Sequence, residues 1–152
     1  MTLNELLTTS RIDLNASISS KKKALEQLAA LLASGTSHLD ALAIFDALAA
    51  REKLGSTGFG DGIAIPHARV NACNAPRCAV ITLDPAIDFD AIDRNDVDIL
   101  WALIVPEEAT DQHLNILAAV AELLGKHEYR QAIRAAQTCD QLFDVIARSQ
   151  EN

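Results

Sequence analysis

The stretch REKLGSTGFGDGIAIPHAR, residues 51–69, decides how the rest of the chain is organised. It holds four of the six glycines of the sequence, at positions 55, 58, 60 and 62. A short apolar run, Ile63–Ile65, follows the glycines and leads through Pro66 to His67. A glycine-rich backbone can approach an anion closely and direct several N–H groups at it. The plainer interpretation is a glycine-rich turn in front of a strand, and the spacing alone leaves both open.

His67 is the candidate nucleophile of this stretch. Pro66 fixes the backbone just before it and so restricts where the ring can lie. Only a neutral imidazole attacks a phosphoryl group, and an ordinary pKa near neutrality keeps that form available. From the residues alone, His67 can also be a structural histidine with its hydrogen bonds satisfied.

Two common phosphate-binding motifs do not fit the glycines. Gly55 and Gly60 have the spacing of a Walker A loop, but Asp61 stands where that loop needs lysine. A dinucleotide fingerprint needs a third glycine at a set spacing and a helix that starts there, and neither is predicted. The stretch therefore does not predict a nucleotide site.

The composition favours a single domain, residues 1–152, with a real hydrophobic core. The chain has 152 residues, a length typical of one domain, and 49% of them are hydrophobic. The formal net charge is −8, and the longest basic run is Lys21–Lys23. Because proteins that bind nucleic acid display basic stripes, this pattern argues against nucleic acid as a partner.

The sequence predicts a soluble, cytoplasmic protein. Three cysteines are an odd and sparse set, which suits free thiols in a reducing compartment better than a disulfide framework. The first residues lack the basic and apolar regions of a signal peptide. The longest strongly apolar run, Ile99–Val105, is far shorter than the roughly 20 residues that span a bilayer. We therefore expect no direct membrane insertion.

No metal and no cofactor are expected. His67, Cys73 and Cys78 can be imagined as zinc ligands, but the C-x4-C spacing lies at the edge of common zinc patterns and no second pair exists. Cys78 also begins a predicted core strand. Nothing in the sequence places a cysteine next to His67, so a Cys–His nucleophile is equally unsupported.

Hydrophobic periodicity predicts the helices and strands. Expected strands cover residues 12–18, 63–65, 78–83 and 97–105, and expected helices begin near residues 20, 37, 110, 127 and 138. Ser20, Ser37, Thr110 or Asp111, and Thr138 are the candidate N-caps. Residues 68–76 and 84–96 are expected to be connections.

The resulting order, β-α-α-β-β-β-α-α-α, predicts an α/β fold of mixed type. The first two helices are joined by only a few residues and should form an antiparallel hairpin. A small mixed sheet of about four strands between helices on both faces, an α/β/α arrangement, is the simplest packing for this order. The run 97–105 is nearly all apolar, as is typical of a strand buried on both faces.

The segment GSTGFGDGIAIPHAR, residues 55–69, resembles the active-site signature of the mannitol/fructose-type IIA proteins of the bacterial phosphoenolpyruvate-dependent phosphotransferase system (PTS). That family has the same order of elements. The resemblance implies that His67 takes a phosphoryl group from a histidine-containing phosphocarrier protein, holds it as a phosphoramidate and passes it on. The protein would then be a phosphocarrier rather than an ordinary small-molecule enzyme.

Two further residues match the family pattern. His113 lies in the first turn of the helix expected after Thr110, where the helix dipole disfavours its charged form. The resemblance implies that His113, in an H-L-x-x-L context, lies beside the phosphorylated histidine and orients or stabilises the phosphoryl group. Arg51 belongs to an R-E pair of the family, and its guanidinium can offset phosphoryl charge. From the residues alone, His113 can be a helix-start residue and Arg51 an ordinary surface arginine.

Ser56, Thr57, Gly58 and Arg69 are further candidates for phosphoryl binding. The two hydroxyls can donate hydrogen bonds to phosphoryl oxygens, or they can merely stabilise the turn, and Arg69 can likewise do either. Asp61 departs from the family, which often has asparagine there. We expect Asp61 to point to solvent, because a carboxylate directed inward would repel a phosphoryl group.

The resemblance leaves the physiological role open. A nitrogen-type regulatory IIA protein (IIA-Ntr) binds targets, such as kinases and potassium transport proteins, according to its phosphorylation state. A fructose- or mannitol-type IIA component instead passes phosphoryl to a IIB domain for sugar uptake. The opening SSKKKALEQLAALLA, residues 19–33, is more like the nitrogen type. A third class is a non-catalytic protein-docking module, with Phe59 and Ile65 near the docking face.

Overall fold

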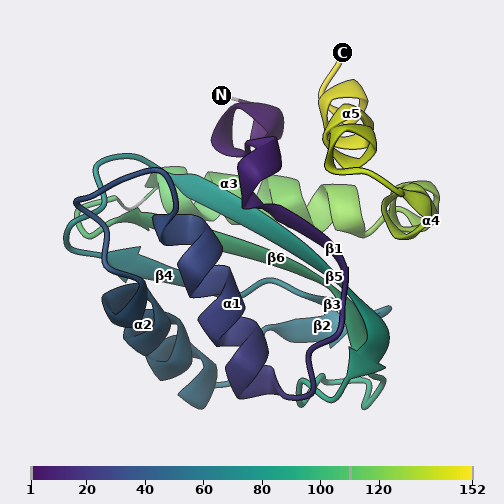
Figure 1. The fold of residues 1–152 in the computed structure, drawn as a ribbon, viewed down its shortest axis with the longest axis horizontal. Helices are drawn as coiled ribbons and strands as arrows, with labels where there is room; N and C mark the ends of the chain where they lie inside the picture. The colour runs from purple at the N-terminus through teal and green to yellow at the C-terminus, as the bar shows by residue number, and fades with distance from the viewer. Residues whose placement is uncertain (1, 110, 152) are drawn as a thin grey trace.

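The computed structural model describes residues 2–109 and 111–151 and has a mixed sheet between two layers of helices (Figure 1). Two 3-10 turns, η1 (Leu3–Leu6) and η2 (Thr9–Arg11), precede strand β1 (Ile12–Ala16) and helices α1 (Lys21–Ala33) and α2 (Ala41–Lys53). Strands β2 (Gly58–Gly60), β3 (Ile63–Ala64), β4 (His67–Val70), β5 (Arg77–Ile87) and β6 (Val97–Pro106) follow. Helices α3 (Asp111–Leu124), α4 (His127–Ala135) and α5 (Cys139–Ser149) complete the described chain.

Strand β6 organises the sheet because it pairs with three other strands. β5 runs antiparallel to it on one side, while β3 and then β4 run parallel to it on the other. The strand order is β1-β5-β6-β3-β2, and β4 pairs with β6 beyond the end of β3. In the described part of the chain β4 has no second partner strand, so His67, which pairs with Leu103, lies at an open edge of the sheet.

Side chains of the central strands alternate between two hydrophobic cores, as the period of two along a strand requires. In β6, Leu100 and Ala102 belong to the core beneath α1 and α2, whereas Trp101 and Leu103 belong to the core beneath α3, α4 and α5. All four side chains are fully buried. Burial on both faces explains the apolar run of β6. It also confirms the predicted α/β/α arrangement of a mixed α/β fold.

In the described part of the chain the sheet has six strands, two more than expected. The prediction of a connection over residues 68–76 was wrong for residues 68–70, which belong to β4. Strand β2 was not predicted either, and β5 extends to Ile87, into the expected 84–96 connection. β2 and β4 are three and four residues long, too short to show a period. Their pairing with β3 and β6, rather than their own composition, makes them strands.

Helix ends follow ordinary capping chemistry. Ser20 and Thr138 cap α1 and α5 with their side-chain oxygens, as predicted. Asp40, rather than Ser37, caps α2, because its carboxylate accepts from two backbone N–H groups. Thr110, a candidate cap of α3, lies outside the described residues. Within residues 2–109 and 111–151, no helix has the length and apolar character needed to cross a membrane.

Candidate functional site

His67 begins strand β4, directly after Pro66, and is half-buried at the open edge of the sheet. Its Nδ1 lies 2.7 Å from the carbonyl oxygen of Ile65. Because a carbonyl oxygen only accepts hydrogen bonds, Nδ1 must carry the hydrogen. In the neutral ring, the lone pair available for attack is therefore on Nε2.

The surroundings of His67 favour the neutral ring. Burial lowers the pKa of His67 below its ordinary value, and the positive charge of Arg51 also lowers it. The hydrogen bond to the carbonyl of Ile65 and the negative charge of Glu52 oppose this change but do not reverse it. At neutral pH, the imidazole is thus available as a nucleophile.

His113 lies beside His67, as the sequence predicts. It sits in the first turn of α3 and is only 9% exposed. The two ring centroids are 5.4 Å apart, and the rings are tilted by 52°. Burial lowers the pKa of His113, and the charges of His67 and Arg69 lower it further. Within the described chain, its buried Nδ1 has no hydrogen-bond partner.

Both arginines predicted for the site line the same hollow as the two histidines. This hollow has a volume of about 480 Å³ and lies between α2, β4 and α3. Arg51 is anchored at its rim, since its Nη1 donates to the carbonyl of Gly55 at 2.8 Å. Arg69 is exposed. Two histidines and two arginines therefore line one hollow.

Apolar side chains form the rim of this hollow on the α2 side. Leu54 lines it and is 85% exposed, and Ala47 and Ala50 line it as well. Leu114, the residue after His113, is 64% exposed. A nucleophile beside exposed apolar groups is suited to a protein partner that would cover them.

Ser56, Thr57 and Gly58 do not line this hollow, although they were predicted to bind phosphoryl oxygens. Ser56 Oγ donates to the carbonyl of Phe89 at 2.6 Å and accepts from the N–H of Gly58 at 3.0 Å. Thr57 donates both its N–H and its hydroxyl to the carboxylate of Glu52. These groups hold the glycine turn in the described structure, and phosphoryl binding by them stays a prediction.

Glu52 is the residue of this region that sequence reasoning missed. Its side chain is 4% exposed, and its Oε1 lies 3.0 Å from Nζ of Lys21. The R-E pair offered a signal, but a role was assigned only to Arg51. A buried carboxylate needs several donors, and which donors are available depends on the fold.

The other residues singled out in the turn face away from the hollow. The side chain of Asp61 is 66% exposed, and its carboxylate lies 3.9 Å from Nη1 of Arg130, so the expected outward direction is confirmed. Phe59 is 41% exposed, as a docking residue should be. Ile65 is only 6% exposed, so placing its side chain on a docking face was wrong. It contributes its carbonyl instead.

The cysteines do not converge on His67. Cys78 is fully buried in β5, and burial raises the pKa of its thiol to about 12. Cys73 donates its thiol to the carbonyl of Ala75. Among residues 2–109 and 111–151, no three His, Cys, Asp or Glu side chains are placed to hold a metal ion.

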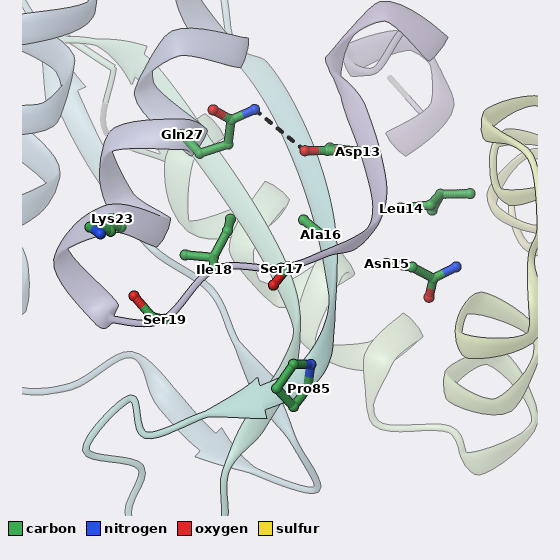
Figure 2. Close-up of a pocket in the computed structure, with 10 residues that line it drawn as sticks. All are labelled: Asp13, Leu14, Asn15, Ala16, Ser17, Ile18, Ser19, Lys23, Gln27 and Pro85. Atoms are coloured by element: carbon green, nitrogen blue, oxygen red, sulfur yellow. Dashed lines mark hydrogen bonds between the residues drawn. The ribbon is translucent and has the colours of Figure 1, made fainter.

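A larger hollow, of about 890 Å³, lies between β1 and the start of α1 (Figure 2). Figure 2 shows Asp13 and Gln27 joined across it by a hydrogen bond of 3.4 Å, with Lys23 and Pro85 farther along its wall. None of the predicted site residues lines it. Size alone therefore does not identify the functional site, whereas the grouping of His67, His113 and the arginines does.

Comparison with known proteins points to one protein family. The sequence profile described as phosphoenolpyruvate-dependent sugar phosphotransferase system, EIIA 2, matches residues 5–149. A nitrogen regulatory protein of Pseudomonas aeruginosa is 46% identical over 144 residues, which cover 95% of this chain and 94% of that protein.

Solved structures give the same result. The crystal structure of nitrogen regulatory protein IIA-Ntr from Neisseria meningitidis has a TM-score of 0.89 and 34% identity, covering 95% of this chain and 98% of that one. IIA mannitol of Escherichia coli, in a complex with phosphorylated enzyme IIB mannitol, shares the fold, with a TM-score of 0.77 and 16% identity over 93% of this chain and 97% of that one. The resemblance predicted from the sequence is thereby confirmed, and the chain belongs to the EIIA 2 family of the phosphoenolpyruvate-dependent sugar phosphotransferase system.

Proposed function

We propose that this chain, as a single IIA domain of residues 1–152, is a cytoplasmic phosphoryl carrier with a regulatory role. His67 accepts a phosphoryl group on Nε2 from a histidine-containing phosphocarrier protein. The observation that carries the proposal is the 2.7 Å hydrogen bond from Nδ1 of His67 to the carbonyl of Ile65. It leaves Nε2 as the unprotonated nitrogen of a ring that lines a hollow with two guanidinium groups.

The transfer is a substitution at phosphorus. The lone pair of Nε2 forms the new N–P bond while the bond between phosphorus and the donor's imidazole breaks, and the donor nitrogen keeps that electron pair. Positive charge develops on the ring of His67 as the bond forms. The Nδ1–H bond to the carbonyl of Ile65 becomes charge-assisted and so stabilises the phosphorylated ring.

Arg51, Arg69 and His113 surround the place where the phosphoryl oxygens would lie. The arginines offset the negative charge of those oxygens while the group is bound and while it moves between the two nitrogens. Neutral His113 can donate one N–H to a phosphoryl oxygen without adding a charge that would trap the group. Ser56, Thr57 and Gly58 support the site by holding the turn.

The regulatory part of the proposal rests on the apolar rim and on the similarity to nitrogen regulatory proteins. A phosphoryl group on His67 would place about two negative charges beside exposed Leu54, which lines the same hollow. Affinity for a partner that covers this leucine would then depend on the phosphorylation state. Target proteins in nitrogen metabolism and potassium homeostasis, such as kinases and potassium transporters, are the proposed partners.

The alternative is a sugar-transport component that passes phosphoryl to a IIB domain. Its supporting observation is the shared fold with IIA mannitol, which was solved in a complex with phosphorylated IIB mannitol. Loss of fructose or mannitol uptake in cells that carry His67→Ala would favour this role. If uptake is normal while His67→Ala and His67→Asp change target binding in opposite directions, the regulatory role is favoured.

Intact-protein mass spectrometry tests the carrier chemistry directly. The full chain is mixed with phosphoenolpyruvate, the first enzyme of the relay and a phosphocarrier of either the nitrogen or the sugar type. We expect one acid-labile phosphoryl group on the unchanged protein and none on His67→Ala. His127→Ala, which alters an exposed histidine elsewhere, should be phosphorylated normally. An unmodified mass with both phosphocarriers would contradict the proposal and favour a docking module.

A further inference from the structure

An ion pair with a buried carboxylate lies behind the glycine turn, outside the hollow that holds the histidines. The carboxylate of Glu52 accepts from the N–H of Thr57 at 3.1 Å and from its hydroxyl, and it is paired with Lys21 at 3.0 Å. Lys21 is itself fixed over the ring of Phe89, with Nζ 4.7 Å from the centroid, and lies 3.5 Å from Asp90. Burying a carboxylate costs free energy unless donors surround it, and here three do.

A continuous path of hydrogen bonds leads from this ion pair to the nucleophile. The carbonyl of Thr57 accepts from the N–H of Ile65 at 3.2 Å. The carbonyl of Ile65 then accepts from Nδ1 of His67 at 2.7 Å. Each link fixes the residue that makes the next one, from Glu52 through Thr57 and Ile65 to the ring.

The position of the Ile65 carbonyl matters more than that of an ordinary backbone group, because it selects the tautomer of His67. Ile65 lies between β3 and β4, where regular pairing with β6 is interrupted. Pro66, which follows, has no N–H to anchor the chain there, although its carbonyl accepts from Leu103. The bond from Ile65 to Thr57 is thus a main constraint on this peptide.

We infer that Glu52 is a positioning residue for phosphoryl transfer. Paired with Lys21, it holds Thr57 so that the carbonyl of Ile65 receives Nδ1–H of His67 and leaves Nε2 free to attack. No hydrogen bond joins Glu52 to the ring: apart from the effect of its charge on the pKa of His67, it acts through Thr57. The inference rests on the proposed function, since the position of the proton matters only if His67 is the nucleophile.

A purely structural role is the competing explanation. Glu52 would then only stabilise the turn, and its loss would lower the free energy of unfolding without changing the ring. The two explanations differ in the tautomer of neutral His67, which long-range ¹H–¹⁵N correlation spectra of the ¹⁵N-labelled full chain report directly. That measurement needs no donor protein, so it is independent of whether phosphorylation occurs.

The test compares Glu52→Gln with Asp46→Asn, the same carboxylate-to-amide change at an exposed position of α2. In Glu52→Gln we expect the ratio of Nδ1–H to Nε2–H tautomer to fall about fivefold, as loss of roughly one net hydrogen bond would produce. The rate of phosphoryl acceptance should fall about tenfold or more, because small displacements of a reacting group are costly. Asp46→Asn should change neither the tautomer ratio nor the rate of phosphoryl acceptance.

Thr57→Val and Thr57→Ser keep the test decisive if Glu52→Gln does not fold. Thr57→Val removes the hydroxyl that donates to Glu52, and it should lower the ratio of Nδ1–H to Nε2–H tautomer. Thr57→Ser retains a hydroxyl and should keep the ratio near that of the wild type. The inference is overturned if the tautomer ratio is unchanged in Glu52→Gln and in Thr57→Val, or in whichever of the two folds. This holds even if the wild-type chain is phosphorylated. A changed ratio in a chain that accepts no phosphoryl group would show that Glu52 sets the tautomer of His67 but would refute the carrier function, and with it a role in phosphoryl transfer.

Discussion

An imidazole has two nitrogens, and the neighbours of each histidine decide which one can react. At His67, the carbonyl of Ile65 fixes the hydrogen on Nδ1 and leaves Nε2 free. At His113, Nδ1 is buried without a partner in the described chain, so no carbonyl holds a hydrogen there as it does at His67. Two histidines 5.4 Å apart thus suit different tasks, attack for His67 and donation to a phosphoryl oxygen for His113.

This difference predicts the behaviour of His113→Ala. The variant should still accept phosphoryl, because the nucleophile and its tautomer are intact. It should transfer the group about 10²-fold more slowly, the usual cost of removing one donor that stabilises a transition state. Single-turnover transfer from the isolated phosphorylated protein measures this, with His127→Ala as control. Wild-type transfer by His113→Ala would remove His113 from the mechanism.

The lowered pKa of His67 predicts how phosphoryl acceptance depends on pH. Burial keeps the pKa below the ordinary value of about 6.5, so the ring stays neutral at pH values where a free histidine is half protonated. The acceptance rate should decline as the pH falls, with the midpoint of the decline below about 6.5. Titration of the ring signals by NMR gives the pKa independently. A decline centred above that value would mean that another group controls the rate.

The same pKa values predict a loss of stability in acid. Both histidines have a lower pKa in the folded chain than in the unfolded one, so the unfolded chain binds more protons in the interval between those values. The free energy of unfolding should therefore decrease as pH falls from about 6.5 toward the folded-state values. Urea unfolding at pH 7 and pH 5.5 measures this, and the decrease should be smaller in a His67→Gln variant.

At the scale of elements, the long segments could be predicted from the sequence and the short ones could not. The sequence shows β5 and β6 as apolar runs, and it shows α1 and α3 as apolar stripes with helical spacing. These patterns arise because one or two faces of each element are buried. β4 consists of four residues whose strand conformation comes from pairing with β6. Its sequence, His67–Val70, contains no period to detect, and the signature of the site was found by resemblance instead.

The candidate site shows the same limit. Four of its members were named from the sequence, because histidines and arginines carry recognisable chemistry: His67, His113, Arg51 and Arg69. Glu52 could not be recognised, since its role depends on Lys21 from α1 and Thr57 from the turn meeting at one carboxylate. The spacing of Lys21, Glu52 and Thr57 along the chain does not predict that they come into contact. Contacts between elements therefore account for most of what sequence reasoning missed.

The hairpin of β2 and β3 is held at its turn by helix α4. Arg134 donates to both carboxylate oxygens of Asp98, at the start of β6, and to the carbonyl of Asp61 at 2.7 Å. A Cβ at Gly62 would lie 2.6 Å from Nη2 of Arg134, and the φ of Gly62 is +79°. The turn can be this close to the guanidinium only because residue 62 is glycine.

Gly62→Ala should therefore destabilise the protein through two effects, backbone strain and displacement of Arg134. Gly35→Ala is the matched control, because Gly35 has φ +78° but no atom within 4 Å of its Cβ position. We expect Gly35→Ala to lower the free energy of unfolding by about 1 kcal/mol and Gly62→Ala by about 2–3 kcal/mol in urea unfolding. Equal losses would show that Arg134 moves away without cost.

At the scale of the whole molecule, the open edge of the sheet explains why the site lies where it does. β4 has no outer neighbour in the described chain, so the end of α2 on one face and the start of α3 on the other both reach its first residue. Arg51 and Leu54 come from or directly after α2, and His113 comes from α3. A net charge of −8 makes such a cationic hollow locally distinct on an acidic protein.

The apolar rim gives a prediction for docking as distinct from chemistry. Leu54→Asp places a charge on the rim of the hollow, while Leu42→Asp makes the same change at a 65% exposed leucine of α2 that does not line it. Leu54→Asp should raise KM for the phosphocarrier about tenfold with little change in kcat, because it removes binding energy common to ground and transition states. Leu42→Asp should leave both constants near wild type.

The separate changes in kcat and KM show whether Leu54 acts in docking or in chemistry. If Leu54→Asp lowers kcat and leaves KM unchanged, the leucine acts on the nucleophile and not on docking. If Leu42→Asp raises KM as much as Leu54→Asp does, the effect is one of total charge, since both variants take the chain from −8 to −9. Only a selective rise at Leu54 places the donor protein over the hollow of His67, where Nε2 can reach the phosphorus atom.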